Sequence, residues 1–188
     1  MEIHNATLRA VLKRLAENGL TLNKQKCELN KREIKFFGHI FSEHGVSVDP
    51  ARVEIIRNLE PPTSAGEVRS LMGMVTYMSS HIPDLATTSE PLRQLTKTGQ
   101  PFVWGDAQRL AFQTLKSQIE RSLQNANFEV GRPTSVVVDA SPVGISALLC
   151  QRDDNGNNKV ITCISRALTE TEKFYPQTHK EALACVWA

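Results

Sequence analysis

The sequence lacks any apolar run that approaches the ~20 residues needed to cross a bilayer, and it opens without the charged and apolar regions of a signal peptide. We therefore expect an intracellular protein that makes no contact with a membrane. Internal repeats and low-complexity segments are also absent. The net charge is only +2, which by itself is too small to indicate a nucleic-acid-binding protein.

Spacings typical of zinc sites are missing as well. The cysteines show no C-x-x-C pattern and sit in apolar or amphipathic runs, so we expect buried free thiols in a reducing compartment. The histidines show no metal-ligand spacing, and we interpret them as non-catalytic. The residues concerned are Cys27, Cys150, Cys163 and Cys185, together with His4, His39, His44, His81 and His179.

The first two thirds of the chain carry helix and hairpin signals. Alternating and aromatic residues predict a strand over Glu33–Ile40, followed by a turn at Glu43–Gly45. Asp49 before Pro50 is a strong helix start, and Ser64 has capping-box spacing from Glu67. Apolar residues recur every three or four positions from there and predict a helix-bundle core. Besides the helix that starts at Ser64, helices are expected at 8–18, 50–60, 89–96 and 106–123, and the second of these is the one that Asp49 starts.

The pattern changes beyond Pro133, where β-branched runs predict an antiparallel meander. Asn155-Gly156 is a strong turn signal between its last two strands. Thr169 has capping-box spacing from Glu172, and a helix is expected from about Lys180. The predicted strands are 135–139, 144–151 and 159–165.

Two carboxylates stand out in this second part of the chain. Asp139 ends the apolar strand Val136–Val138, and Glu181 stands near the start of the last helix. Hydrolysis of a phosphodiester commonly uses two divalent ions held by such carboxylates, and Mg²⁺ prefers oxygen ligands. Simpler explanations remain open, because Asp139 could cap the turn that follows it, and Glu181 could form a capping box with Thr178.

Residues 9–35 form the most basic part of the chain, with eight basic residues against three glutamates, a local balance of +5. Such a stretch is usually a solvated surface, but it could also follow a phosphate backbone. The basic residues are Arg9, Lys13, Arg14, Lys24, Lys26, Lys31, Arg32 and Lys35.

Taken in order, many short matches from Leu8 to Ala188 resemble the Pol polyprotein of gypsy-type LTR retrotransposons. Those resembling the end of the reverse transcriptase palm are Gly19–Asn23, Lys26–Glu28 and the primer-grip segment Phe36–Ser42. Those resembling the thumb and connection are Asp49-Pro50, Arg69–Gly73, Tyr77, Ile82-Pro83, Pro91-Leu92, Leu95, Phe102–Trp104, Ala111-Phe112 and Leu115-Lys116. Those resembling the RNase H opening are Asp139–Ser141, Gly144, Ala147–Leu149, Gln151, Ser165-Arg166, Leu168-Thr169, Glu172-Lys173, Tyr175 and Lys180-Glu181.

This resemblance implies an α+β or α/β architecture. We expect the end of the palm with a primer-grip-like hairpin over 1–48 and a helical thumb and connection over 49–124. The N-terminal part of an RNase H-like mixed sheet with a flanking helix would fill 125–188. Val138 stands where the family usually has threonine, and residues 122–132 match it poorly.

The resemblance also implies site residues and partners. Asp139 and Glu181 would be part of the RNase H catalytic and Mg²⁺-binding set, and the partners would be an RNA:DNA hybrid or primer-template and the rest of the polyprotein. The nucleic-acid-binding candidates are Phe37, Gly38, His39, Lys24, Lys26 and Arg166.

The parent enzyme would be an RNA-directed DNA polymerase with RNase H activity. Its Tyr-x-Asp-Asp motif would lie before Met1, and two further carboxylates would lie after Ala188. Both active sites are therefore expected to be incomplete here, with weak Mg²⁺ binding and no hybrid cleavage. The alternative is a retrotransposon-derived protein that binds nucleic acid or a protein partner without catalysis.

Overall fold

The structure is a computed structural model that describes residues 2–121 and 124–188. The chain divides into two compact units, Met1–Ile34 and Lys35–Ala188. As expected, the fold combines helices with small antiparallel sheets. None of the described helices combines the length and the apolar character that crossing a bilayer requires.

The first unit consists mainly of one helix and one helical turn. The helix predicted over 8–18 is confirmed as α1 (Glu2–Glu17), which begins earlier than predicted and buries none of its residues within the described structure. The 3₁₀ turn η1 (Lys24–Lys26) follows, and Asn23 caps it by accepting a hydrogen bond from the amide of Gln25 at 2.9 Å. Ile3 is 84 % exposed, so the apolar residues of α1 are available for packing.

Three short strands form a sheet in the order β1-β2-β3, namely β1 (Glu33–Phe36), β2 (His39–Ser42) and β3 (Gly45–Val48). The prediction of one strand through Ile40 is wrong. Phe37 and Gly38 have φ angles of 48° and 76°, a left-handed conformation that ends β1 and turns the chain. The predicted turn at Glu43–Gly45 is confirmed, because Ser42 and Gly45 face each other across β2 and β3.

A helical layer follows the hairpin. Asp49 caps α2 by accepting a hydrogen bond from the amide of Ala51, and Ser64 caps α3 through the amide of Glu67, so both predicted helix starts are confirmed. Leu92 is fully buried in the resulting core. The elements are α2 (Pro50–Arg57), α3 (Ala65–Tyr77), η2 (Ser79–His81), α4 (Leu85–Thr88), α5 (Glu90–Gln94) and α6 (Asp106–Glu120). The end of the last predicted helix, at 122–123, lies outside the described residues.

The second sheet is the predicted antiparallel meander, in the order β4-β5-β6. Its strands are β4 (Thr134–Ala140), β5 (Gly144–Arg152) and β6 (Asn158–Ala167). The Asn155-Gly156 turn lies between β5 and β6, with Gly156 at a φ of 81°. Helices α7 (Glu170–Lys173) and α8 (Gln177–Trp187) complete the chain, and the predicted Thr169–Glu172 capping box starts α7.

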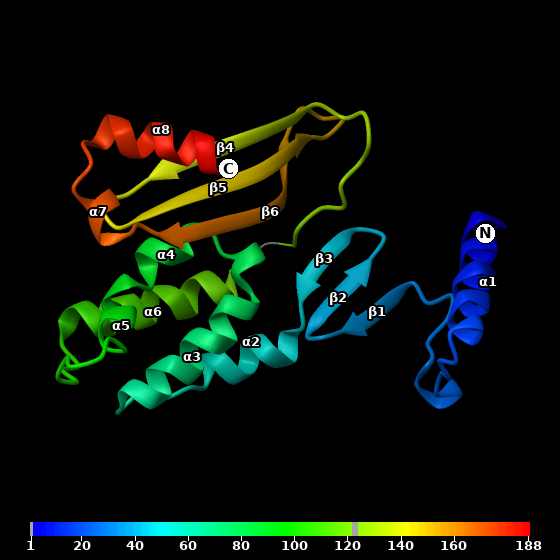
Figure 1. The fold of residues 1–188 in the computed structure, drawn as a ribbon, viewed down its shortest axis with the longest axis horizontal. Coiled ribbons are helices and arrows are strands. Elements are labelled where there is room, and N and C mark those ends of the chain that lie inside the picture. The colour runs from blue at the N-terminus through cyan, green and yellow to red at the C-terminus, as the bar shows by residue number, and fades with distance from the viewer. Residues whose placement is uncertain (1, 122–123) are drawn as a thin grey trace. The chain divides into compact units, whose positions relative to one another are not determined.

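Helices cover both faces of this sheet (Figure 1). On one face Ala184 of α8 packs with Val138 and Ala140 of β4. On the other face α4 packs against β5 and β6, and the amide of Ala86 donates a hydrogen bond to Ser165 Oγ at 3.2 Å. Because side chains alternate along a strand, Asp139 points to the face that α4 partly covers, away from α8.

The cysteine prediction is half right. Cys150 and Cys163 are buried free thiols, whereas Cys27 and Cys185 are exposed. Burial, together with the nearby Cys150, raises the pKa of Cys163 to about 11, so this thiol stays protonated at neutral pH. Cys185 is exposed because it lies on the solvent side of α8, whose buried side carries Ala184.

Gly45 occupies a position where a side chain would strain the fold. Its φ is 130°, and a Cβ there would lie 1.9 Å from the carbonyl oxygen of Asn125. We expect Gly45→Ala to lower the free energy of unfolding by at least about 2 kcal/mol, because strain adds to a clash with backbone. Urea unfolding monitored by circular dichroism measures the change.

Gly73→Ala is the matched control. Gly73 lies inside α3, and a Cβ added there would meet nothing within 4 Å, so this change should raise stability by about 0.5–1 kcal/mol. Equal midpoint urea concentrations for the unfolding of Gly45→Ala and of the unchanged protein would contradict the prediction.

Candidate functional site

Asp139 lies within β4 near its end, and its carboxylate is exposed. It stands opposite Ser146 of β5. The turn after the strand is capped by Ser141 instead, whose Oγ accepts hydrogen bonds from the amides of Val143 at 3.2 Å and Gly144 at 2.9 Å. The simpler explanation of Asp139 as a turn cap is therefore wrong, and its carboxylate is left available.

Glu181 lies in the second turn of α8, which begins at Gln177, earlier than predicted. No side chain caps this helix, so the Thr178–Glu181 capping box is also wrong. The side-chain amide of Gln177 instead donates to Glu181 Oε1 at 2.7 Å and to the carbonyl of Ala140 at 2.6 Å. Through Gln177, Glu181 is linked to the residue that follows Asp139.

The two predicted catalytic carboxylates approach the end of β4 from different faces of the sheet. Ala140 contacts the α8 side, where Glu181 lies, whereas Asp139 points to the α4 side. Among residues 2–121 and 124–188, no group of three or more His, Cys, Asp or Glu side chains is placed to hold a metal ion. The donors themselves are carboxylate oxygens, the type that Mg²⁺ prefers.

Asp84 is a further carboxylate near Asp139. It precedes α4 in a left-handed conformation with a φ of 50°. Burial raises the pKa of Asp84, and the charge of Asp139 adds to the shift. No local sequence pattern indicates this proximity, because Asp84 and Asp139 meet only through the packing of α4 on the sheet.

The tip between β1 and β2 presents an aromatic pair to solvent. Phe37 is 69 % exposed, and its ring makes an edge contact with that of Phe36, with centroids 4.5 Å apart. The tip is fixed from behind, because the Tyr77 hydroxyl at the end of α3 donates a hydrogen bond to the carbonyl of Phe37. Phe37 is therefore held outward on an anchored turn.

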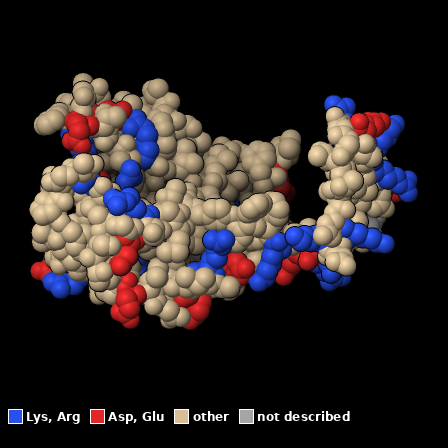
Figure 2. Space-filling model, turned by 60° about the horizontal axis from the view of Figure 1, so that its bottom comes forward, with Lys and Arg blue, Asp and Glu red and all other residues tan. Residues whose placement is uncertain are grey.

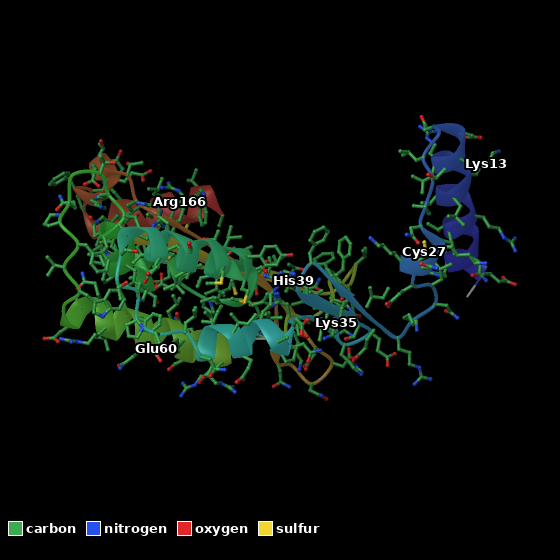
Figure 3. All side chains as sticks on the ribbon, turned by 90° about the horizontal axis from the view of Figure 1, so that it is seen from below. Lys13, Cys27, Lys35, His39, Glu60 and Arg166 are labelled. Carbon is green, nitrogen blue, oxygen red and sulfur yellow. The ribbon has the colours of Figure 1, made fainter. Side chains whose placement is uncertain are left out.

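Gly38 and His39 have more internal positions than Phe37. A Cβ on Gly38 would lie 2.0 Å from Nε of Arg52, whose guanidinium lies over the Tyr77 ring. The His39 ring packs 5.1 Å from Tyr77 and 5.3 Å from His81, measured between centroids. His39 thus helps to attach the hairpin to the helical layer (Figure 3).

The basic candidates Lys24 and Lys26 lie on η1 of the first unit and are exposed. Figure 2 shows Lys and Arg side chains on this unit, with acidic groups among them. Lys13 pairs with Glu17 at 3.8 Å. In the second unit, Lys35 pairs with Asp49 at 3.3 Å. Part of the positive charge of residues 9–35 is therefore already balanced within the protein.

Arg166 is engaged inside the protein. Its two terminal nitrogens donate to the two carboxylate oxygens of Glu172 at 2.7 and 2.9 Å. Its guanidinium also lies 5.8 Å from the centroid of the Trp187 ring. The paired Arg166 and the amide of Thr169 lower the pKa of Glu172 to about 2. Arg166 therefore joins β6 to α7 and α8.

Comparisons with known proteins agree with this architecture. Residues 104–188 match the family described as the RNase H-like domain found in reverse transcriptase. Over 198 residues the chain is 33% identical to the Retrovirus-related Pol polyprotein from transposon opus of Drosophila melanogaster, covering 100% of this chain and 20% of that protein. It is 34% identical over 191 residues to the corresponding polyprotein from transposon 297 of the same organism, covering 98% of this chain and 17% of that protein.

The fold is also similar to solved structures. A foamy viral protease-reverse transcriptase in complex with RNA/DNA hybrid matches with a TM-score of 0.77 and 21% identity, covering 100% of this chain and 25% of that one. The chain spans about a fifth of the length of the two curated polyproteins that it resembles. These similarities confirm the family resemblance predicted from the sequence and do not favour the alternative of a non-catalytic remnant.

Asp84→Asn tests the cost of burying this carboxylate, to which the charge of Asp139 adds. The raised pKa of Asp84 means that the folded state binds its proton more tightly, so this group's contribution to stability falls as pH rises from 3.8 through the folded pKa. We expect Asp84→Asn to raise the free energy of unfolding at pH 7 by a few tenths of a kcal/mol, with no gain near pH 3. Urea unfolding at both pH values measures it.

Glu60→Gln is the control, since Glu60 is exposed and makes no ion pair among the described residues (Figure 3). A stabilisation by Asp84→Asn that is equal at both pH values would show that charge is not its cause.

Glu172→Gln tests the Arg166 pair. Because the pKa of Glu172 is lowered to about 2 from 4.5, its charged form stabilises the fold above pH 4.5, and this contribution is lost as pH falls towards 2. We expect the variant to lose about 1 kcal/mol at pH 7, less than the ~1.5–3 kcal/mol of hydrogen bonds to charged groups, because solvent screens a partly open site. The difference should shrink below pH 4.5 in urea titrations.

Glu170→Gln is the matched control. Because Glu170 is 75% exposed, its substitution should lower the free energy of unfolding less than that of Glu172. A Glu172→Gln loss that stays constant down to pH 2 would contradict the assignment.

Proposed function

We propose, from its place in the reverse transcriptase and RNase H-like region of LTR-retrotransposon Pol polyproteins, that this chain holds an RNA:DNA hybrid or primer-template for that machinery. The observation that carries the proposal is the similarity of nearly the whole chain to Pol polyproteins, with residues 104–188 matching the RNase H-like family. The partners would be the nucleic acid and the rest of the polyprotein, and such a role would place the chain inside the cell.

The hairpin tip is the proposed contact with the primer. Phe37 offers an exposed, anchored ring that can pack on a sugar or a base. Gly38 allows the tight turn, and His39 supports it from the inner side. Lys24 and Lys26 would follow the phosphate backbone as exposed point charges. Arg166 is the weakest member of the proposed set, because its donors already bind Glu172.

Asp139 and Glu181 are the proposed RNase H carboxylates of this chain. Both supply the oxygen ligands that suit Mg²⁺, which when bound would activate water and stabilise the leaving oxygen of a phosphodiester. Asp139 is exposed near the end of its strand, and Gln177 links Glu181 to the carbonyl of Ala140, the residue that follows Asp139. Two carboxylates make a weak site, so we expect residues 1–188 to bind a hybrid without cutting it.

The test is binding to a fluorescently labelled RNA:DNA hybrid, followed by anisotropy at several salt concentrations and with Mg²⁺ present. We expect affinity to fall steeply with salt. Phe37→Ala should weaken binding about tenfold, the low end for an aromatic ring stacked on a nucleotide. Asp139→Asn should leave binding unchanged, and gel analysis should show intact RNA.

Phe174→Ala is the matched control, because Phe174 is 87% exposed but lies beside α7, away from the hairpin. Absence of hybrid binding by the unchanged chain would overturn the proposed function. Mg²⁺-dependent cutting that Asp139→Asn abolishes would show instead that this chain carries a working nuclease site.

A further inference from the structure

A cavity lies between the helical layer and the second sheet, apart from the hairpin tip and from the two carboxylates. Its volume is about 350 Å³, at the lower end of the range of small-molecule sites. Helix α3 forms one wall, α4 and α5 form another, and Ser165 of β6 closes it. It thus lies where the helices meet the RNase H-like sheet.

Two arginines line this cavity from neighbouring helices. Arg69 projects from α3 and Arg93 from α5, and these two helices pack against each other. Both arginines are exposed, and neither makes an ion pair with any part of the chain that the structure describes. Arg57 and Arg109, which line a different cavity, are each paired with carboxylates at 2.8 Å and 2.6 Å. The free guanidinium groups of the first cavity are thus available to a ligand.

Hydroxyl groups lie beside the two arginines. Thr76 stands two helical turns from Arg69 on the same side of α3, and Ser79 follows on η2. Neither of these side chains has a hydrogen-bond partner within the described residues. Ser165 accepts a hydrogen bond from Ala86, so its own proton remains free to be donated. The cavity therefore combines two fixed positive charges with neutral donors.

Carboxylates are missing from the lining of this cavity, as far as the described residues show. Glu90 of α5 and Glu170 of α7 are both paired with lysines. Lys173 pairs with Glu90 at 3.6 Å and with Glu170 at 3.0 Å, and Lys97 also pairs with Glu170. Asp84 directly precedes the lining residue Leu85, and burial raises its pKa. A negatively charged ligand would accordingly meet no carboxylate among the lining residues themselves.

We propose that this cavity binds a phosphate group of a nucleic-acid backbone, with Arg69 and Arg93 as its two cationic ligands. Guanidinium groups match phosphate oxygens in geometry and remain charged at every physiological pH. Because the cavity joins the helices to the sheet, a duplex held here would be fixed relative to Asp139. The inference rests on the proposed function and adds to it a defined contact for the backbone.

The experiment compares three proteins: the unchanged chain, the double variant Arg69→Gln/Arg93→Gln, and the control Arg57→Gln/Arg109→Gln, which loses the same charge. The dissociation constant for a labelled RNA:DNA hybrid is measured over a salt series. A plot of the logarithm of the association constant against the logarithm of the salt concentration has a negative slope. We expect the Arg69/Arg93 variant to make this slope shallower by about 1 to 2 and the control to change it little. Circular dichroism confirms that all three are folded.

A parallel titration of each protein with inorganic phosphate alone, followed by NMR of the arginine Nε–H signals, separates the two sources of phosphate. Weak binding of free phosphate that the hybrid displaces supports the proposal. Tight binding of free phosphate that the hybrid does not displace would make the cavity a small-anion site and overturn it.

The hybrid measurements separate the two proposals. Equal slopes for both double variants, with normal hybrid binding, would overturn the cavity assignment and leave the proposed function standing. No hybrid binding by the unchanged chain would overturn both.

Discussion

The packing of the short helix α4 on strands β5 and β6 is the contact on which the arrangement of residues 35–188 depends. Ala86 donates to Ser165 Oγ at 3.2 Å, and the Thr87 and Ser141 hydroxyls lie 2.7 Å apart. Gly144 makes this approach possible, since a Cβ there would lie 3.1 Å from that of Ala86. The same contact brings Asp84 near Asp139 and closes the arginine-lined cavity, so electrostatics and recognition both follow from one small interface.

Local signals in the sequence predicted much of the secondary structure. Asp49 before Pro50, Ser64 with Glu67 and Thr169 with Glu172 each start a helix as expected, because a capping side chain satisfies amides only a few residues away. The Asn155-Gly156 turn follows for a similar reason, since it needs a left-handed residue at one position. The two carboxylates stood out by their positions beside a predicted strand and helix, the family resemblance gave them their expected role, and the structure supplied their surroundings.

Features that depend on distant residues could not be predicted in this way. Phe37 has the aromatic character of a strand residue, yet Tyr77, forty positions later, holds its carbonyl in a left-handed turn. Thr178 and Glu181 have capping-box spacing, but Gln177 reaches across to β4 and the helix begins before them. Arg69 and Arg93 carry no motif at all. Their common cavity arises only when α3, α5 and β6 come together, which no local pattern encodes.

The attachment of the hairpin tip to the helices has a mechanical consequence. Tyr77 is the last residue of α3, and Arg52 of α2 lies over its ring. The amide of Asp49 also donates to the carbonyl of Gly38 at 2.9 Å, next to the start of α2. The tip is therefore attached directly to α2 and α3 and should move with them. A rotation of α3 against the β4-β5-β6 sheet would move Phe37 with it. The distance between the hairpin tip and Asp139 therefore depends on how α3 packs and not on a flexible loop.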